Sequence, residues 1–511
     1  EGNTTITASE GSNSIKLYCN DSAGNINVSE RYFTTDTTPP PIYIKVPRNV
    51  TYSQSYLLFK IQSIGAVKGW HSLDAGENIT MNKLLNDYFE YNSSTLSEGV
   101  HTVTFHSNDS YNNTGGETVV FTIKYPPDSG EFVINGSEEV WQYNYSQTLS
   151  EDVKFNLFEN GKFKSEYSNL TLNPSTAYSD MLFTENESVF SMNKSNLKST
   201  RYINAYFRGK SAVFNESDVE STIYTYFEKN ISVDIISSTF GHLGVVSEGT
   251  NNLTIEDLSP GFISSNNITS STTNYRIDIT NSTISKIEFH ARGNSNNTIL
   301  NSTLNFYNYY YENSSTYISS SVIDGNADFY GTSKVTVVNT EFTVRGMFRD
   351  NTEAVINDST FADAWFYSYA TLNISNSTFN SLKLYGVTIA DFKKPTSTIS
   401  SIYVYPGVST IKGWIDMPST VATWSSGAEV TREYPVKVTN AITGLPVSGA
   451  TVDIKDETIT LWSGTTDTEG YAYPEITFNS TTYGDTYWVF VNNNNETSLR
   501  FTSDTEIDIQ I

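Results

Sequence analysis

The fold is decided by the stretch Ile356-Asn357-Asp358-Ser359-Thr360-Phe361, which returns eighteen residues later as Ile374-Ser375-Asn376-Ser377-Thr378-Phe379. Both copies place an apolar residue, two polar residues, a Ser-Thr pair and a second apolar residue in the same order. A unit of about 19 residues is too short for a propeller blade and has no helical period. It matches the length of one coil of a parallel β-helix.

The unit repeats through the middle of the chain. The second apolar residue of each copy is Ala177, Leu197, Val219, Phe240, Pro260, Ile284, Leu304, Val322, Phe342, Phe361 or Phe379. Their spacing predicts a β-helix of about eleven coils, with an N-terminal cap, over residues 128–395. Right-handed winding is expected because parallel crossovers are almost always right-handed. The residue five positions before each of the last six, Tyr317 among them, should also point inward.

A polar residue recurs three positions before the second apolar residue. These residues are Asn281, Asn301, Asn339, Asp358 and Asn376. Asn and Asp tolerate the left-handed backbone needed between two strands, and stacked side chains can hydrogen-bond from coil to coil. The row predicts a structural ladder, and it resembles the asparagine ladder of pectate-lyase-like β-helices.

Composition favours an all-β protein outside the cytoplasm. The chain has 511 residues, a net charge of −25, 34 tyrosines and one cysteine, Cys19. The spread negative charge argues against nucleic-acid binding, and the absence of a 20-residue apolar run predicts no membrane span in this sequence. About 26 Asn-x-Ser/Thr sequons, roughly twice the number expected by chance, favour a secreted glycoprotein carrying N-linked glycans.

Ten sequons are candidates for glycosylation: Asn20, Asn49, Asn78, Asn92, Asn135, Asn144, Asn186, Asn230, Asn313 and Asn495. The sequons at Asn281, Asn301 and Asn376 coincide with the ladder. Stacked ladder side chains should be inaccessible, so these three are predicted to be unmodified.

The first 125 residues contain an internal repeat. Sliding the chain by 88 positions aligns Ser9-Glu10-Gly11 with Ser97-Glu98-Gly99, and Asn20-Asp21-Ser22 with Asn108-Asp109-Ser110. The segment Leu17–Asn25, followed by Asp36-Thr37-Thr38-Pro39-Pro40, resembles the end of immunoglobulin-like modules in archaeal surface proteins. Residues 1–40 are therefore expected to form the C-terminal half of such a module, and 41–127 a complete one.

A half module exposes sheet edges and an apolar face to water, which promotes aggregation. Two explanations remain open. Preceding residues of a longer protein complete the module, or a neighbouring subunit, such as another copy of this chain, donates the missing strands.

Residues after 395 lose the 19-residue spacing. Residues 396–432, with Ile411–Pro418 as a capping strand, are expected to cover the end of the β-helix. The segments Gly444–Val452 and Gly464–Gly470 resemble the carboxypeptidase-regulatory-like module, which implies a small β-sandwich over 433–511.

Many of the enzymes that this β-helix resembles cut polysaccharides, so the resemblance implies that catalytic residues could lie on its faces. The paired acidic motifs of such hydrolases do not occur in the sequence. Asp324, Asp328, Asp350 and Asp363, with Arg345 and Arg349 nearby, offer a possible lyase-like cluster, but solvated surface is the simpler interpretation. We therefore predict no enzyme activity and assign no catalytic, metal-binding or cofactor-binding residue.

Aromatic residues are predicted to form a partly exposed stripe along one face of the β-helix: Tyr310, Tyr330, Phe348, Trp365, Tyr367 and Tyr385. Such a stripe can be covered by the chain itself, pack against another protein or stack on sugars.

The resemblances and the sequons together imply an extracellular, cell-surface structural glycoprotein. The leading hypothesis is self-assembly of copies into a surface layer or filament through protein-protein contacts. One alternative is an adhesin that binds surface glycans through the aromatic stripe. The other is a polysaccharide lyase or glycoside hydrolase acting on the β-helix.

Overall fold

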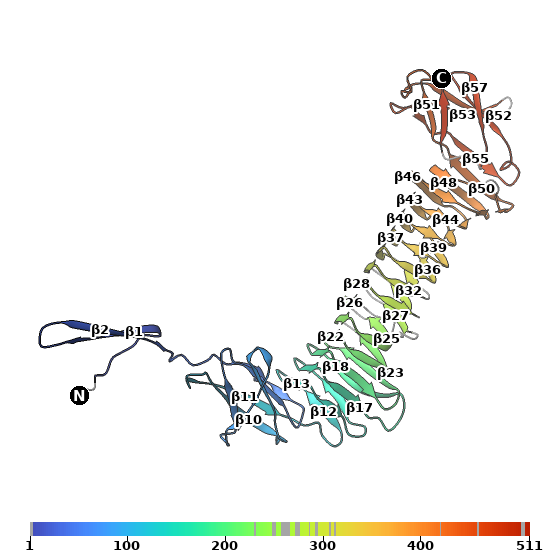
Figure 1. Ribbon diagram of the computed structural model, residues 1–511. Coiled ribbons are helices and arrows are strands. Elements are labelled where there is room, and N and C mark those ends of the chain that lie inside the picture. The colour runs from blue at the N-terminus through green and yellow to red at the C-terminus, as the bar shows by residue number, and fades with distance from the viewer. Residues whose placement is uncertain are drawn as a thin grey trace. The chain divides into compact units, whose positions relative to one another are not determined.

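The structure is a computed structural model, and it is almost entirely β (Figure 1). It describes residues 4–511 except 229–230, 248–251, 257–265, 271–275, 286, 292–294, 306–307, 311–312, 419–420, 457–458 and 502–505; side-chain surroundings are described for fewer residues between 221 and 309. The chain divides into two units. One contains Glu1–Pro127, Ser137–Gln147 and Phe163–Ser168, and the other contains the remaining residues to Ile511.

The first unit begins with a two-stranded antiparallel hairpin. Its strands are β1 (Gly11–Asn20) and β2 (Ile26–Thr35), paired from Gly11↔Thr35 to Asn20↔Ile26. Further along the same unit, β10 (Gly99–Asn108) and β11 (Thr114–Ile123) repeat these bounds and this register 88 residues later. The internal repeat predicted from the sequence is therefore present in the strand bounds.

The complete module of the first unit has two sheets around one core. The first sheet contains β3 (Tyr43–Val46), β5 (Leu58–Gln62), β9 (Tyr88–Asn92) and β8 (Asn82–Lys83). The second joins β7 (Ile79–Thr80), β6 (Lys68–Leu73), β10, β11, β4 (Thr51–Tyr52) and β13 (Glu139–Tyr143). A 3-10 turn spans Leu85–Asp87, and β14 (Ser146–Thr148) and β16 (Lys162–Glu166) follow β13.

Alternation of apolar and polar residues along these strands produces the core of the module. Phe59, Ile61, Phe89, Phe105 and Phe121 are fully or almost fully buried. The rings of Phe59 and Phe105 meet edge to face at 5.9 Å between centroids.

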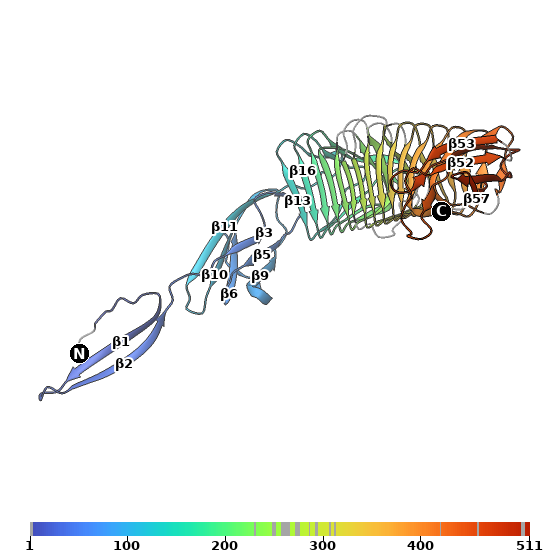
Figure 2. The same ribbon diagram turned by 90° about the horizontal axis from the view of Figure 1, so that it is seen from above.

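The second unit contains a parallel β-solenoid of about twelve turns, whose strands are stacked in series in Figure 2. This confirms the predicted β-helix. Most coils contain a long strand, a turn, a short strand and a third strand. Parallel pairing joins each strand to its counterpart one coil away, as in Ile356↔Ile374 and Phe361↔Phe379.

The long strands are β19 (Val189–Asn193), β22 (Ser211–Asn215), β24 (Ser232–Ile236), β26 (Asn252–Glu256), β28 (Arg276–Thr280), β31 (Asn296–Leu300), β34 (Ser315–Ser319), β37 (Lys334–Val338), β40 (Glu353–Asn357), β43 (Thr371–Ser375), β46 (Ile389–Ile399), β48 (Gly407–Asp416) and β50 (Ala428–Glu433). The short strands are β17 (Asn169–Leu172), β20 (Asn196–Ser199), β29 (Thr283–Ser285), β32 (Thr303–Asn305), β35 (Val322–Asp324), β38 (Glu341–Phe342), β41 (Thr360–Phe361) and β44 (Thr378–Phe379).

The third strands are β12 (Glu131–Ile134), β15 (Lys154–Leu157), β18 (Ser179–Glu185), β21 (Ile203–Arg208), β27 (Asn266–Ser270), β30 (Ile287–Ala291), β33 (Asn308–Tyr310), β36 (Asn326–Phe329), β39 (Arg345–Phe348), β42 (Ala364–Phe366), β45 (Leu382–Leu384), β47 (Ile402–Val404) and β49 (Thr423–Trp424). Two longer strands, β23 (Asp218–Glu228) and β25 (Thr239–Ser247), span the short and third positions of their coils.

Aromatic residues stack inside the coils. Phe342, Phe361 and Phe379 lie ring on ring at 4.3 and 5.2 Å, and all three are fully buried. Repeating one residue type at one coil position places like side chains at the strand spacing of about 4.8 Å, so flat rings can stack without gaps.

The predicted inward residues are correct in most described coils and wrong in two. Leu170, not Ala177, pairs with Leu197 in its coil, and Ala177 is exposed. Ile318 and Ile323 are fully buried where Tyr317 and Val322 were expected, and Tyr317 is 41% exposed. A slip of one residue moves a side chain to the opposite face of a strand. Pro260 lies outside the described residues.

The β-helix extends beyond residue 395, so the predicted boundary is too early. β48, which contains most of the expected capping strand, pairs in parallel with both β46 and β50. The end is covered instead by β55 (Glu475–Asn479), which pairs antiparallel with β50. An antiparallel partner closes the edge of the sheet to further coils.

The C-terminal module supplies β55 and two further sheets. One contains β54 (Tyr471–Ala472), β51 (Val436–Thr439) and β58 (Ile507–Gln510), and the other β53 (Ile459–Thr465), β52 (Thr451–Asp456), β56 (Tyr487–Val491) and β57 (Asn494–Leu499). Lys394 joins the module to the last coils through Glu506 at 3.1 Å and the Tyr471 hydroxyl at 2.8 Å. No helix in the described part of the chain is long and apolar enough to cross a membrane.

Candidate functional site

One face of the N-terminal hairpin corresponds to the buried face of the complete module. Val103 and Phe105 are fully buried there, whereas their equivalents Ile15 and Leu17 are 40% and 64% exposed. In the complete module, β10 pairs with β6 along the edge that faces away from β11, and β11 pairs with β4 along the edge that faces away from β10. Among the described residues, β1 and β2 form a sheet of two strands only.

The opposite face of the hairpin differs from the repeat. Tyr18, Ile26, Val28 and Tyr32 lie on it with exposures of 64%, 73%, 53% and 79%. The equivalent positions of the complete module carry His106, Thr114, Gly116 and Val120. We call these four hairpin residues the outer face. Completing the module would cover Ile15 and Leu17, but it would leave the outer face in water.

The turns of the two hairpins are the same. The Asp21 carboxylate accepts hydrogen bonds from the backbone N–H groups of Ala23 and Asn25, both at 2.9 Å, and from the Asn25 side chain at 2.9 Å. Asp109 accepts the equivalent bonds from Tyr111 at 2.8 Å and from the backbone and side chain of Asn113, both at 2.9 Å. Local sequence is sufficient to form this turn, with or without a core beneath it.

Only part of the predicted aromatic stripe lies on the surface. Tyr310 and Phe348 are fully buried and stack on Phe329 inside the coils, so their assignment to an exposed stripe is wrong. In these coils the inward residue of the third strand comes six positions after that of the short strand, as Phe348 does after Phe342. In the next two coils the separation is five, as in Phe361 and Phe366.

Tyr330, Trp365, Tyr367 and Tyr385 are half-buried on the outside of the third strands. The rings of Tyr367, Tyr385 and Tyr405 stack at 4.3 and 4.1 Å. Burial raises the pKa of both the Tyr367 and Tyr385 hydroxyls. Stacked rings present their edges rather than their faces to solvent.

Cations lie against the remaining ring faces. Arg345 and Lys383 each lie 4.5 Å from the Trp365 ring, and Arg349 lies 5.0 and 4.6 Å from the rings of Tyr330 and Tyr367. These cation–π contacts use the ring surface that a sugar would stack on. The geometry favours packing of the stripe within the chain.

Each of the four predicted acids has polar partners in the chain. Asp328 lies 3.8 Å from Arg345 and accepts a hydrogen bond from Tyr330 at 3.0 Å, and Asp363 pairs with Lys383 at 2.8 Å. Asp324 accepts hydrogen bonds from Asn305 and Thr343, and Asp350 accepts one from the backbone of Gly331. Burial raises the pKa of Asp328 above its ordinary value, although Arg345 and Arg349 oppose the shift. Among the described residues, no group of three or more His, Cys, Asp or Glu is arranged to hold a metal ion.

No protein-family model matches this chain, and no curated protein matches its sequence.

The predicted ladder residues occupy the turns after the long strands. Asn281, Asn301, Asn339, Asp358 and Asn376 have φ between 45° and 53°, in the left-handed region. The Asn301 side chain donates to that of Asn281 at 3.3 Å, and Asn376 donates to Asp358 at 2.5 Å. All five side chains are exposed. The expectation that the ladder makes them inaccessible is therefore wrong.

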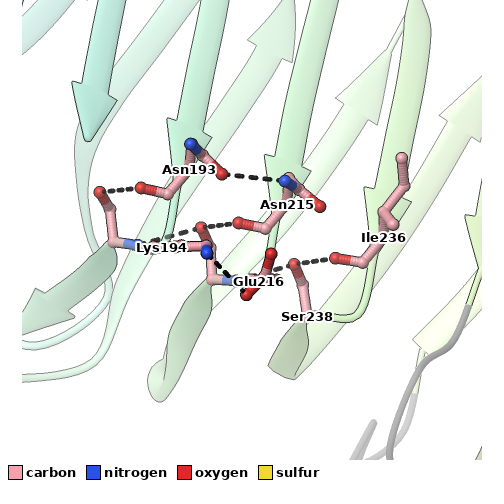
Figure 3. A network of polar contacts seen from close by, with 8 residues as sticks. Asn193, Lys194, Asn215, Glu216, Ile236 and Ser238 are labelled. Atoms are coloured by element: carbon pink, nitrogen blue, oxygen red, sulfur yellow. Dashed lines mark hydrogen bonds and ion pairs between the residues drawn. The ribbon is translucent and has the colours of Figure 1, made fainter. Parts of the chain in front are cut away.

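A second ladder, which the sequence interpretation missed, lies one residue further along each turn. Its members are Ser195, Ser217, Ser238, Ser282, Ser302, Ser321, Thr340, Ser359 and Ser377, all buried. Each hydroxyl donates to the carbonyl two residues earlier, at 2.6 to 2.9 Å. Many also accept a backbone N–H from the neighbouring coil, as Ser302 does from Ser282 at 3.1 Å. Figure 3 shows part of this network around Asn193, Asn215, Ile236 and Ser238. The invariant Ser or Thr in the repeat was the available signal.

Eight of the ten glycosylation candidates have exposed side chains: Asn20, Asn49, Asn78, Asn92, Asn135, Asn144, Asn186 and Asn313. Asn230 and the side chain of Asn495 lie outside the described residues.

Proposed function

We propose that this chain is an extracellular structural glycoprotein whose copies assemble into a cell-surface layer or filament. Its solenoid would act as a rigid spacer, and its N-terminal hairpin would join one copy to the next. The proposal retains the finer resemblances found in the sequence: immunoglobulin-like modules of archaeal surface proteins, a right-handed pectate-lyase-like β-helix and a carboxypeptidase-regulatory-like module.

The observation that carries the proposal is the apolar outer face of the hairpin. Tyr18, Ile26, Val28 and Tyr32 replace three polar or small residues and one valine of an otherwise equivalent sheet. Exposed apolar surface of this kind marks protein-protein contacts. A contact between identical copies needs no second component, and a patch that binds a different surface of the next copy can propagate along a filament or layer.

The test is assembly of an outer-face variant. Tyr18→Thr, Val28→Thr and Tyr32→Thr keep residues that favour strands and remove the apolar surface. Burying one large apolar side chain contributes roughly 1.5–3 kcal/mol. We therefore expect the triple variant to need at least about tenfold more protein for half-assembly, measured by light scattering and negative-stain microscopy.

A matched control uses the complete module. Val100 and Val120 are also exposed on β10 and β11, at 70% and 42%. Val100→Thr with Val120→Thr should leave assembly unchanged. Equal assembly of the outer-face variant and the original chain, or a chain that stays monomeric at all concentrations, would reject the proposal.

A further inference from the structure

The solenoid contains sequons in two registers relative to the buried serine-threonine ladder. In the first, Asn281, Asn301 and Asn376 occupy the left-handed turn, and the ladder takes the next residue. In the second, Asn193, Asn215 and Asn357 end the long strand, and the ladder takes the residue two positions later. We call these the turn register and the strand-end register.

The registers differ in the hydroxyl that defines a sequon. In the strand-end register it belongs to Ser195, Ser217 or Ser359, which are 1%, 4% and 2% exposed. Each of these hydroxyls donates to the carbonyl of its own sequon asparagine, at 2.7 to 2.8 Å. It is therefore held inside the coil, away from any enzyme that must read it.

In the turn register the defining hydroxyl lies outside the ladder. It belongs to Thr283, Thr303 or Thr378, of which the first two are half-buried and the third is exposed. The asparagine two residues earlier is exposed in each case. The two groups that make a sequon are thus accessible together on the folded protein.

We infer that Asn281, Asn301 and Asn376 are sites of N-linked glycosylation, and that Asn193, Asn215 and Asn357 are not. The inference rests on the proposed extracellular glycoprotein. The Asn side-chain nitrogen would attack the anomeric carbon of an activated glycosyl phosphate. A C–N bond forms, the C–O bond to the phosphate breaks and the phosphate leaves with the bonding electron pair. The proton lost by the amide passes to solvent.

The ladder tolerates this chemistry. A glycosylated amide keeps one of its two N–H groups, and Asn301 and Asn376 each donate one hydrogen bond to the preceding coil. Beside the same row of turns lies a surface hollow of about 290 Å³, lined by Ser320, Asn339, Glu341 and Thr360 among others. A glycan on the row has open space next to it.

The experiment is glycopeptide mass spectrometry of the full chain, secreted from a cell that glycosylates sequons. We expect glycan at Asn281, Asn301 and Asn376 and none at Asn193, Asn215 and Asn357. Thr303→Val should remove glycan from Asn301 alone.

A gain-of-site variant provides the sharpest control. Asn339 lies in the turn register with φ 48° but is followed by Thr340-Glu341, and Glu341 is exposed. Glu341→Thr creates a sequon there and should raise glycan occupancy at Asn339 from nil to most of the protein.

The outcomes separate the inference from the proposed function. Glycan at Asn49 or Asn78 but not in the turn register, or equal occupancy in both registers, would overturn the inference and leave a glycoprotein. Absence of glycan from every sequon of the chain isolated from its own cells would reject the glycoprotein itself.

Discussion

The two hairpins of the first unit have the same strand bounds, register and turn, yet opposite surroundings. In β10–β11, Val103 and Phe105 pack on a core that contains Phe59 and Phe89. In β1–β2 the residues equivalent to Val103 and Phe105, Ile15 and Leu17, are exposed. Local sequence therefore determines the hairpin, and the segment between Tyr43 and Asn92 determines whether its apolar face is covered. In this structure the apolar face of the N-terminal hairpin is therefore exposed.

The largest expected effect is the difference in unfolding free energy between substituting a buried residue and substituting its exposed equivalent. Phe105→Ala should lower the free energy of unfolding of the complete module by about 3–5 kcal/mol, because it leaves a cavity beside Phe59. Leu17→Ala, at the equivalent hairpin position, should change it by less than about 0.5 kcal/mol. Urea unfolding followed by tryptophan fluorescence measures both, and equal losses would mean that the hairpin is already covered in the dispersed protein.

A smaller effect should appear with pH, because the complete module buries a histidine for which the hairpin has no equivalent. Burial lowers the pKa of His71 to about 4, from about 6.5 for an exposed histidine. Between these values the unfolded chain binds a proton that the folded module does not. The free energy of unfolding should therefore be intact above pH 6.5 and fall by about 1–3 kcal/mol as pH decreases toward 4.

His101 contributes with the opposite sign. Burial opposes its protonation, but the Ser97 carbonyl and the Asp74 carboxylate, at 2.8 and 2.7 Å, raise its pKa above the ordinary value. Its stabilisation is present at low pH and is lost as pH rises through that pKa. His71→Phe should remove the loss of stability on acidification and leave the contribution of His101. Unchanged pH dependence in this variant would contradict the assignment.

The smallest expected effect is the loss of stability of the two hairpin turns at low pH. Hydrogen bonds from Asn25 lower the pKa of Asp21, and those from Asn113 outweigh burial to lower the pKa of Asp109. Both turns should lose stability as pH falls through these lowered values. NMR titration should find both carboxyls below their ordinary pKa, and Asp21→Ala should open only its own hairpin, seen as faster amide exchange in β1 and β2. A normal pKa at Asp21 would mean that its turn needs a core.

The sequence predicted the parts of the fold that depend on local pattern. The repeat around Phe342, Phe361 and Phe379 gave the solenoid, and the 88-residue repeat gave the paired hairpins. One error arose where two apolar residues are adjacent, since Val322 was chosen as the inward residue although Ile323 preserves the 19-residue spacing on both sides. The end of the solenoid was missed although Ser397-Thr398-Ile399 repeats the pattern once more. In the next coil Ile415 and Asp416 of β48 pair with Ser397 and Thr398, so the pattern ends there while the strand pairing continues.

The candidate sites were harder to predict because they depend on burial. Asn301 and Ser302 are adjacent in the sequence, but one is exposed and the other is enclosed between coils. Trp365 was expected to be a contact residue, whereas its ring lies against Arg345 and Lys383, which come from other coils. The outer face could have been predicted from the sequence. Aligning Tyr18 with His106 and Val28 with Gly116 shows that larger apolar or aromatic side chains replace a polar and a small residue.

The most direct test of the account is hydrogen exchange in β1 and β2, compared between dispersed and assembled protein. If copies join through the hairpin, amides of Gly11–Asn20 and Ile26–Thr35 should exchange markedly more slowly after assembly, while those of β10 and β11 stay the same. Assembly that leaves hairpin exchange unchanged would contradict the central claim.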